Sequence, residues 1–310
     1  MQMVHTLGDI PRDGRFVFAL GFFDGFHRGH RQIWEAARAM AGERGALPGL
    51  MTFSPHPASV LFPDRPVPLL QSEAERVRYM EEMGAAIAVV LRPTRAFLAE
   101  PAETFLEELS AVPGLSGLLC GENFTFGRGA EGSAGDLARY FRTGGVRVQV
   151  LPLMTDASIG GRVISSSEIR RFLAEGDAEK AAALLGRPYE LSGDIVHGFK
   201  RGASALGFPT ANLSLGEGRI LPADGVYASY ARIRGKRYPA VTNVGKNPTF
   251  GNTKRTVETF ILDFDECIYG EPFSIELISR IRGEIRFQDV SLLCAQIEKD
   301  IGRAKEILTR

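Results

Sequence analysis

The strongest constraint on the fold is an alternation of short apolar runs with segments of helical period through the first 186 residues. The apolar runs are residues 16–20, 49–53, 86–91, 117–120 and 146–151. The segments of helical period are 29–44, 73–83, 101–109 and 135–141. This alternation predicts a parallel sheet covered by helices on both faces. Ligands of such sheets collect at the carboxyl ends of the strands, so the residues that follow each strand form the candidate site.

Residues 21–30, Gly-Phe-Phe-Asp-Gly-Phe-His-Arg-Gly-His, follow the first predicted strand and lead into a helix. Backbone N–H groups and the positive end of a helix favour a phosphate at such a place. His27 and His30 could donate hydrogen bonds to its oxygens. The alternative is an ordinary strand-to-helix turn that happens to carry histidines. The segments 54–57 and 121–127 follow two further strands and are predicted to reach the same edge.

Another helix start is predicted at Ser165, because Ser165 and Glu168 have the spacing of a capping box. Its serine hydroxyls, first-turn amides and Arg170 would suit a triphosphate, and the alternative is a capped helix with surface arginines. The helical pattern ends at Gly186, with Pro188 beyond it. We therefore predict two domains, residues 1–186 and 187–310.

The second half is rich in β-type runs separated by turn signals, which predicts an antiparallel barrel or sandwich. These runs are 190–196, 225–234, 238–244, 256–264 and 273–285. A helix is predicted at the end of the chain. Its apolar residues near a common face are Val290, Leu293, Ile297, Ile301 and Ile307.

Two places in this half are candidates for chemistry. Thr210 and Asn212 are two residues apart and share a face if the chain is extended. Their neutral oxygens could hold a magnesium ion that keeps waters and substrate phosphates; the alternative is a loop entering a strand. Glu258 is a carboxylate in an apolar run, and such a residue usually faces solvent.

Composition narrows the classes of function. The formal net charge is zero, which offers no electrostatic case for nucleic acid or an anionic membrane. Lys180 is the first lysine in the chain, and no Gly-Lys-Ser/Thr tripeptide exists, which excludes a Walker loop. The three cysteines form no CxxC pair, so neither zinc nor a disulfide framework is expected. The absence of a signal peptide and of a long apolar run predicts a cytoplasmic protein.

The order of these motifs resembles the bacterial bifunctional riboflavin kinase/FMN adenylyltransferases, also called FAD synthetases, over nearly the whole chain. The motifs that carry the resemblance are 21–30, 52–57, 121–127, 164–170, 207–212, 243–250 and 258–259. It implies a Rossmann-like nucleotidyltransferase domain with a parallel sheet, then an antiparallel β-barrel riboflavin kinase domain with a terminal helix. The kinase would convert riboflavin and ATP to FMN. The first domain would transfer AMP from a second ATP to FMN, giving FAD and pyrophosphate.

The resemblance also assigns roles to residues. It gives His27, His30 and Arg170 catalytic roles in adenylyl transfer and makes Glu258 the catalytic base of the kinase. It implies ATP contacts at Gly21, Phe22, Asp24, Gly29, Asn123, Ser165, Ser166, Gly207, Thr210 and Asn212. Flavin contacts are implied at His56, Pro57 and Phe124; the alternative for residues 54–57 is a rigid turn. Thr210 and Asn212 would also hold Mg²⁺, and the protein would be a monomer or a weak homo-oligomer.

The chain departs from the family pattern in two places. Phe260 stands where many members have a histidine, and the flap predicted at 197–207 is one residue longer than expected. Three rivals remain: an enzyme with one working activity, a flavin carrier without catalysis, and a fragment of a class I aminoacyl-tRNA synthetase. Retention of His27, His30 and Glu258 argues against the carrier, and zero net charge argues against the synthetase.

Overall fold

The structure is a computed structural model that describes residues 1–310 except 197–207, 217, 247–254, 269 and 310. It divides into two compact units, Met1–Ser165 and Ser166–Arg310. Helices α6 (Ser166–Glu175) and α7 (Ala178–Leu185) group with the second unit, because α7 packs on strands of its barrel. The functional boundary after residue 186 stays a prediction. Within the described ranges, no helix is both long and apolar enough to cross a membrane.

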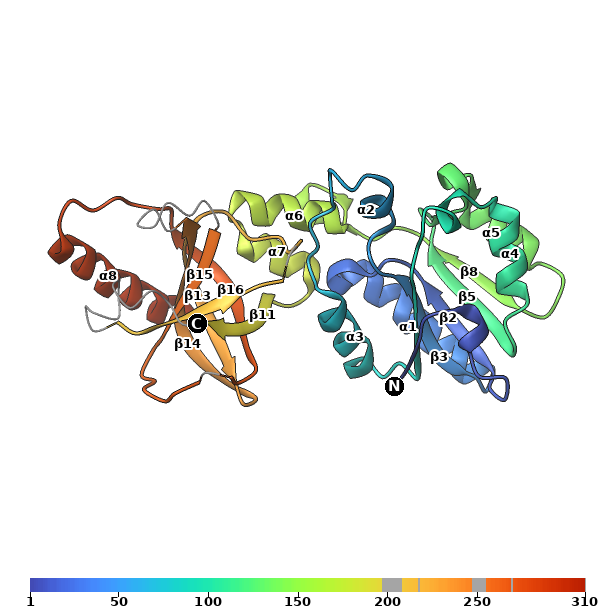
Figure 1. Cartoon of the computed structure of the whole chain (residues 1–310), viewed down its shortest axis with the longest axis horizontal. Coiled ribbons are helices and arrows are strands. Elements are labelled where there is room, and N and C mark those ends of the chain that lie inside the picture. Colours follow the sequence, from blue (N-terminus) through green and yellow to red (C-terminus); the bar gives the residue numbers. More distant parts are fainter. Residues whose placement is uncertain (197–207, 217, 247–254, 269, 310) are drawn as a thin grey trace. The chain divides into compact units, whose positions relative to one another are not determined.

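The first unit is built on a parallel sheet of six strands in the order β1-β4-β3-β2-β5-β8 (Figure 1). The strands are β1 (Gln2–Val4), β2 (Phe16–Leu20), β3 (Leu47–Phe53), β4 (Ile87–Leu91), β5 (Leu115–Gly121) and β8 (Arg147–Leu151). The predicted parallel sheet is confirmed, with strand ends within two residues of expectation. Strand β1 was missed, because three residues are too few to show an alternation.

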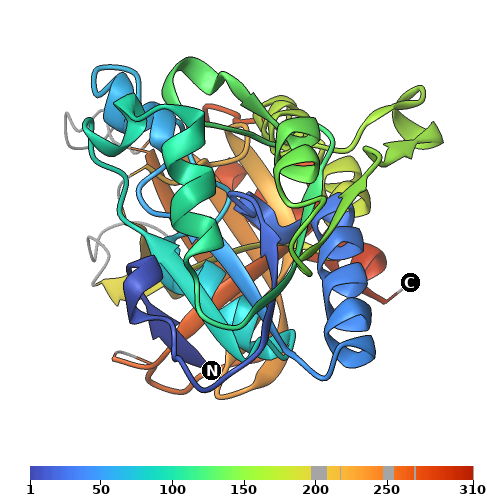
Figure 2. The same ribbon diagram turned by 90° about the vertical axis from the view of Figure 1, so that its right-hand side faces the viewer.

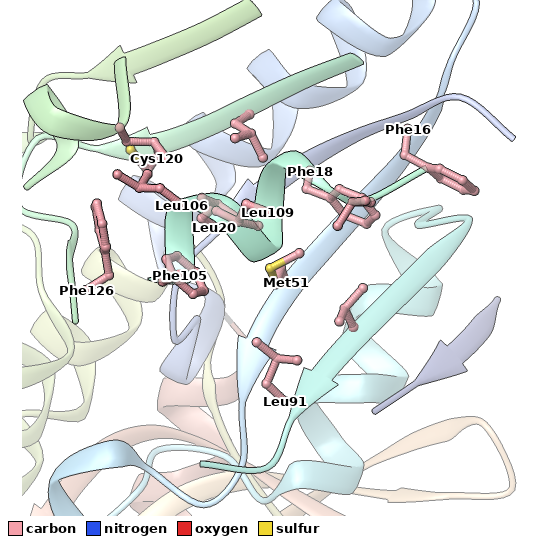
Figure 3. Close-up of a cluster of buried hydrophobic side chains, with 14 of the residues drawn as sticks. Phe16, Phe18, Leu20, Met51, Leu91, Phe105, Leu106, Leu109, Cys120 and Phe126 are labelled. Carbon is pink, nitrogen blue, oxygen red and sulfur yellow. The ribbon is translucent and has the colours of Figure 1, made fainter. Parts of the chain in front are cut away.

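The central strand β2 is buried on both faces, so successive side chains enter two different cores. Phe16, Phe18 and Leu20 pack in one core, which Figure 3 shows with side chains from β3, β4, β5 and α4. Val17 and Ala19 pack in the other core, under α1 and α3. Figure 2 views the first unit from the side of α4 and α5.

Helices cover both faces of this sheet. The predicted ones are α1 (Arg28–Glu43), α3 (Glu73–Glu82), α4 (Ala102–Ser110) and α5 (Ala134–Tyr140), and all four are confirmed. The shorter α2 (Pro57–Leu61) was not predicted. Minor elements complete the unit: η1 (Leu7–Asp9), η2 (Asp24–Phe26), η3 (Phe97–Ala99), β6 (Thr125–Phe126), η4 (Arg128–Ala130), β7 (Gly132–Ser133), β9 (Thr155–Asp156), η5 (Ala157–Ile159) and β10 (Arg162–Val163).

The strand order locates the candidate site at one edge of the sheet. The chain runs from β2 outward through β3 to β4, then returns to place β5 on the other side of β2. The order therefore reverses between β2 and β5, and ligands of such sheets bind at the carboxyl ends beside that point. The segments that follow β2, β3 and β5 all leave the sheet at this edge.

The second unit contains a closed antiparallel barrel in the order β11-β12-β15-β14-β13-β16, with β16 pairing back to β11. Its strands are β11 (Tyr189–Val196), β12 (Thr210–Ser214), β13 (Gly225–Ile233), β14 (Lys236–Lys246), β15 (Arg255–Ile261) and β16 (Phe273–Arg282). The predicted barrel is confirmed. The terminal helix α8 (Val290–Leu308) covers part of its outer surface.

Helix α8 packs through a narrower apolar face than the sequence pattern indicated. Ile301 and Ile307 pack with Ala304 against a cluster that includes Val241 of β14 and Phe260 of β15. Val290 was expected on this face, but its side chain is 57% exposed. It begins the helix, ahead of the stretch that contacts the barrel.

A buried ion pair joins α8 to β16. The Arg282 guanidinium donates from Nε to both Asp300 carboxylate oxygens at 3.0 Å and from Nη2 to Oδ2 at 2.7 Å. Gln296 Nε2 adds a bond to Asp300 Oδ1 at 2.9 Å. The Asp300 side chain is 4% exposed and that of Arg282 is 18% exposed, so the carboxylate is buried and the guanidinium mostly so.

We expect Asp300→Ala to loosen α8, because it leaves the Arg282 cation buried without its counter-charge. Removing one partner of a buried pair costs about 3–5 kcal/mol. The control is Glu306→Ala, because the Glu306 side chain is 64% exposed and pairs with Arg303 of the same helix at 2.7 Å; about 1 kcal/mol or less is expected there. Amide hydrogen exchange of α8 measures both variants. Equal effects would show that the pair adds nothing beyond a surface contact.

Candidate functional site

The segment between β2 and α1 has a backbone conformation that residues other than glycine rarely adopt. Phe23, Gly25 and Phe26 have φ angles of 56°, 79° and 43°. Left-handed φ at a non-glycine residue costs of order 1–3 kcal/mol and persists only where its surroundings enforce it. Both phenylalanine rings are fully buried and stack at 5.2 Å between centroids. Their burial, worth roughly 1.5–3 kcal/mol each, offsets this strain and holds the segment in shape.

This backbone brings His27 and His30 together. His27 precedes α1 as its N-cap, and its Nδ1 accepts the backbone N–H of His30 at 3.4 Å. The two imidazole rings stack at 3.6 Å between centroids, with 20° between their planes. Accepting at Nδ1 places the proton of a neutral His27 on Nε2, where it can be donated. The pair therefore sits at the positive end of a helix, as a phosphate site requires.

His30 is held neutral by its surroundings. Burial, the neighbouring His27 and the Arg76 cation, in that order, bring the pKa of His30 well below 6.5. Its ring lies edge-on to Phe23 at 5.3 Å and Phe26 at 6.2 Å. At neutral pH it is therefore an uncharged hydrogen-bonding group.

Gly29 brings the segment before α6 beside the histidines. A Cβ at Gly29 would lie 3.3 Å from the His27 ring and 3.8 Å from the carbonyl oxygen of Ile164. Ile164 is held in turn by a backbone bond from its N–H to Met154 at 2.8 Å. Residues 164–165, the start of the second predicted phosphate motif, thus approach the first motif within the same unit.

The side chains of Asp24 and His56 accept hydrogen bonds from the backbone. The buried Asp24 carboxylate accepts the N–H groups of Leu70 at 2.9 Å and Gln71 at 3.2 Å. His56 is the N-cap of α2, accepting the Ala58 N–H at 3.0 Å, and Pro57 is the first residue of that helix. The His56 ring meets the ring of Phe22 edge-on at 4.3 Å. The assignment of these residues to nucleotide or flavin stays a prediction.

The segment after β5 contains two predicted site residues, of which Asn123 is exposed and Phe124 is packed against the core. Asn123 is exposed, and its Oδ1 lies 3.0 Å from the place where a Cβ would sit on Gly121. Phe124 is half-buried against the core under α4, with its ring 5.8 Å from that of Phe126. Gly21 directly follows β2 and donates its N–H to Met51 O at 3.1 Å. Ser166 and Arg170 lie on α6, in the second unit, and their role in the nucleotide site stays a prediction.

In the barrel, strand register places Asn212, Glu258 and Asn243 in one row across three neighbouring strands. Glu258 on β15 is directly opposite Asn212 on β12 and directly opposite Asn243 on β14. Thr210 lies two residues from Asn212, so its side chain falls on the same face. Thr259, the next residue after Glu258, is fully buried inside the barrel, which puts Glu258 on the outer face. The prediction that Thr210 and Asn212 share a face is confirmed.

This outer row suits a magnesium–nucleotide complex better than a protein-built metal cage. Thr210 and Asn212 offer neutral oxygens, and no cluster of three His, Cys, Asp or Glu residues exists within the part of the chain that the structure describes. Mg²⁺ binds oxygen and commonly keeps waters and substrate phosphates as ligands. Phe260, opposite Thr210, meets the Phe208 ring at 5.5 Å and packs toward α8. Gly207 and the predicted flap at 197–207 lie outside the described residues.

Comparison with known proteins gives a family match for each half of the chain. The FAD synthetase family matches residues 9–168, and the riboflavin kinase family matches residues 185–308. A bifunctional riboflavin kinase/FMN adenylyltransferase of Listeria monocytogenes is 37% identical, covering 92% of this chain and 90% of the relative. One of Escherichia coli is 32% identical, covering 98% of this chain and 96% of the relative. The chain belongs to the family of bifunctional riboflavin kinase/FMN adenylyltransferases.

A solved structure has the same fold throughout. It comes from Streptococcus pneumoniae, is described as a macrolide-efflux protein, and is 31% identical with a TM-score of 0.87 over 98% of both chains. Membership of the family makes this chain an enzyme with two activities, a riboflavin kinase and an FMN adenylyltransferase. Families with these activities use ATP, generally with a divalent metal.

Sequence reasoning missed two side chains at these sites. Arg76 of α3 is buried against the segment between β2 and α1, although an arginine in a helix usually faces solvent. Its spacing of four residues from the buried Met80 was a signal that it lies on the inward face of α3. Asn243 entered only as part of a motif, and strand register alone reveals that it stands beside Glu258 in the kinase unit.

The neutral His30 predicts a pH dependence of stability for the adenylyltransferase unit. Below about pH 6.5 the His30 imidazole binds a proton in the unfolded chain but stays neutral in the folded one. The free energy of unfolding therefore falls as the pH falls, by up to about 1.4 kcal/mol per pH unit. We expect His30→Gln to flatten this fall. Unfolding between pH 8 and pH 5, followed by fluorescence of the chain's single tryptophan, Trp34 of α1, measures it. Parallel curves for the two proteins would contradict the neutral assignment.

Proposed function

We propose that adenylyl transfer occurs at the carboxyl edge of the parallel sheet and riboflavin phosphorylation at the outer row of the barrel. The observation that carries this division is the presence of two unlike sets of side chains. Stacked histidines at a helix start suit phosphate oxygens. A carboxylate flanked by amides suits the deprotonation of an alcohol. ATP is the phosphoryl donor in one reaction and the adenylyl donor in the other.

In the kinase reaction the ribityl 5′-hydroxyl of riboflavin attacks the γ-phosphorus of ATP. Glu258 accepts the hydroxyl proton, the bond from the γ-phosphorus to the bridging oxygen breaks, and FMN and ADP result. Thr210 and Asn212 would hold Mg²⁺, which neutralises phosphate charge when bound. The register supports this assignment, because Asn212 stands directly across from Glu258.

In adenylyl transfer the FMN phosphate is already a nucleophile, so a general base is unnecessary. One of its oxygens attacks the α-phosphorus of ATP, and the bond to pyrophosphate breaks to leave FAD. His27 and His30 donate hydrogen bonds to phosphate oxygens, which stabilises the charge that develops during transfer. The neutrality of His30 supports a hydrogen-bonding role rather than a charge-pairing one.

The remaining assignments rest on the sequence. Arg170, Ser165 and Ser166 are proposed to bind triphosphate, Asn123 and Asp24 to serve the nucleotide side, and His56, Pro57 and Phe124 to serve the flavin. A cytoplasmic location and a monomeric or weakly oligomeric state follow from composition and from the resemblance.

The division into two sites predicts that the activities can be lost separately. Glu258→Ala should lower FMN formation from riboflavin by roughly 10²–10⁴-fold, because the alcohol loses its base, and leave FAD formation from supplied FMN unchanged. His27→Ala should do the reverse, with a loss on the order of 10²-fold or more in FAD formation. Timed incubation with ATP and magnesium, with flavins separated chromatographically, measures both. Equal loss of both activities in either variant would refute the two-site assignment.

A further inference from the structure

Arg76 is a buried cation that contacts the segment between β2 and α1, where adenylyl transfer is proposed to occur. Its side chain belongs to α3, and the residue is 1% exposed. Burial brings the pKa of Arg76 down to about 10, so it is still a cation at neutral pH. A buried cation is costly unless its hydrogen bonds are made in good geometry. The bonds that Arg76 makes therefore indicate what it does.

Its guanidinium joins the ends of two neighbouring strands. Nη1 donates to the carbonyl of Phe22 at 2.7 Å and to Thr52 Oγ1 at 3.2 Å. Nη2 donates to the carbonyl of Phe53 at 2.9 Å. Phe22 lies two residues beyond β2 and Phe53 ends β3. One planar group thus fixes both points at which the chain leaves the sheet, toward residues 23–30 and toward residues 54–57.

The same guanidinium supports a ring that lies between the two segments. Its central carbon is 4.3 Å from the centroid of the Phe22 ring. That ring meets His56 edge-on at 4.3 Å. A continuous set of contacts therefore runs from Arg76 through Phe22 to His56. The Thr52 hydroxyl adds a further bond to the Phe22 carbonyl at 2.9 Å.

One feature of Arg76 is not explained by stability. Arg76 Nε has no hydrogen-bond partner among the described residues, so a buried donor is left unpaired. The carboxylates of Asp24 and Glu73 favour the Arg76 cation, so its charge is compensated in part. A methionine at the same place on α3 would avoid the unpaired donor but would leave the Phe22 and Phe53 carbonyls without this partner. Local rules are broken in this way at places where geometry matters for function.

We propose that Arg76 is a positioning residue for adenylyl transfer. By holding the backbone at Phe22 and Phe53 together, it keeps residues 23–30, proposed to bind the nucleotide, at reacting distance from residues 54–57, proposed to bind the flavin. Because its side chain is buried, it acts through the backbone that it holds rather than on a substrate. A displacement of about 1 Å at a reacting centre can cost on the order of a hundredfold in rate, so a residue behind the site can matter this much. The inference rests on the proposed location of adenylyl transfer in the first unit.

The test compares Arg76→Met, Arg76→Lys and the matched control Arg44→Met in the full-length chain. Arg44 donates to Ser116 Oγ at 2.8 Å and to the carbonyl of Gly145 at 2.5 Å, at the amino edge of the same sheet. FAD formation is measured against FMN and ATP concentration, at a temperature below the unfolding of every variant. Riboflavin kinase activity of the same preparation reports the folded second unit, and fluorescence of the buried Trp34 reports the folding of the first unit, which contains Arg76.

We expect Arg76→Met to lower kcat/KM for FAD formation on the order of a hundredfold, with KM raised for both substrates and kinase activity unchanged. Arg76→Lys keeps the charge but loses the planar fork, so it should remain at least roughly tenfold below the natural chain. For Arg44→Met, kcat/KM for FAD formation should stay within about twofold of the natural value, because Arg44 lies at the opposite edge of the sheet.

Three results would overturn the proposal. They are natural kcat and KM in Arg76→Met with only a lower melting temperature, full recovery in Arg76→Lys, and an equal loss in Arg44→Met. If Arg76→Met does not fold, the proposal is tested by kcat/KM for FAD formation in Arg76→Lys alone. Failure of the natural chain to make FAD from FMN would instead refute the proposed function.

Discussion

The burial of β2 on both faces is the constraint on which the proposed adenylyltransferase site depends. Both surfaces of this strand are covered, and the chain begins α1 within a few residues of its carboxyl end. It does so with left-handed φ at Phe23 and Phe26, which their buried rings enforce. The same turn stacks His27 on His30 and buries His30, so core packing and phosphate chemistry arise from one stretch of chain.

The kinase unit depends on strand register in a comparable way. A slip of one residue in β15 would turn Glu258 into the barrel and Thr259 out of it. The barrel interior opposes this slip, because the Thr259 hydroxyl bonds to that of Thr242 at 3.0 Å and Thr242 bonds to Ser229 at 2.8 Å. All three residues are fully buried, so an unpaired hydroxyl would be costly. This interior hydroxyl chain therefore keeps the carboxylate on the outer face.

The two sites suit reactions with different chemical needs, and the product of one is the substrate of the other. An alcohol nucleophile calls for a base, which the barrel offers as a carboxylate. A phosphate nucleophile calls for alignment and charge stabilisation, which the sheet edge offers as neutral rings and helix amides. Arg76 would extend alignment beyond the residues that meet substrate, since it joins the two segments that leave β2 and β3.

The sequence by itself determined the class of each half and the order of the elements, and it supplied the residues that are proposed to carry the chemistry. Periodicity follows from burial of one or both faces of an element, and His27, His30, Thr210, Asn212 and Glu258 stand in local patterns. Only the tertiary structure decided which distant residues meet. The row of Glu258 with Asn243 depends on pairing between strands. The inward position of Arg76, and the exposed position of Val290, depend on where a helix docks. Such facts arise from packing between segments far apart in the chain, which local patterns do not encode.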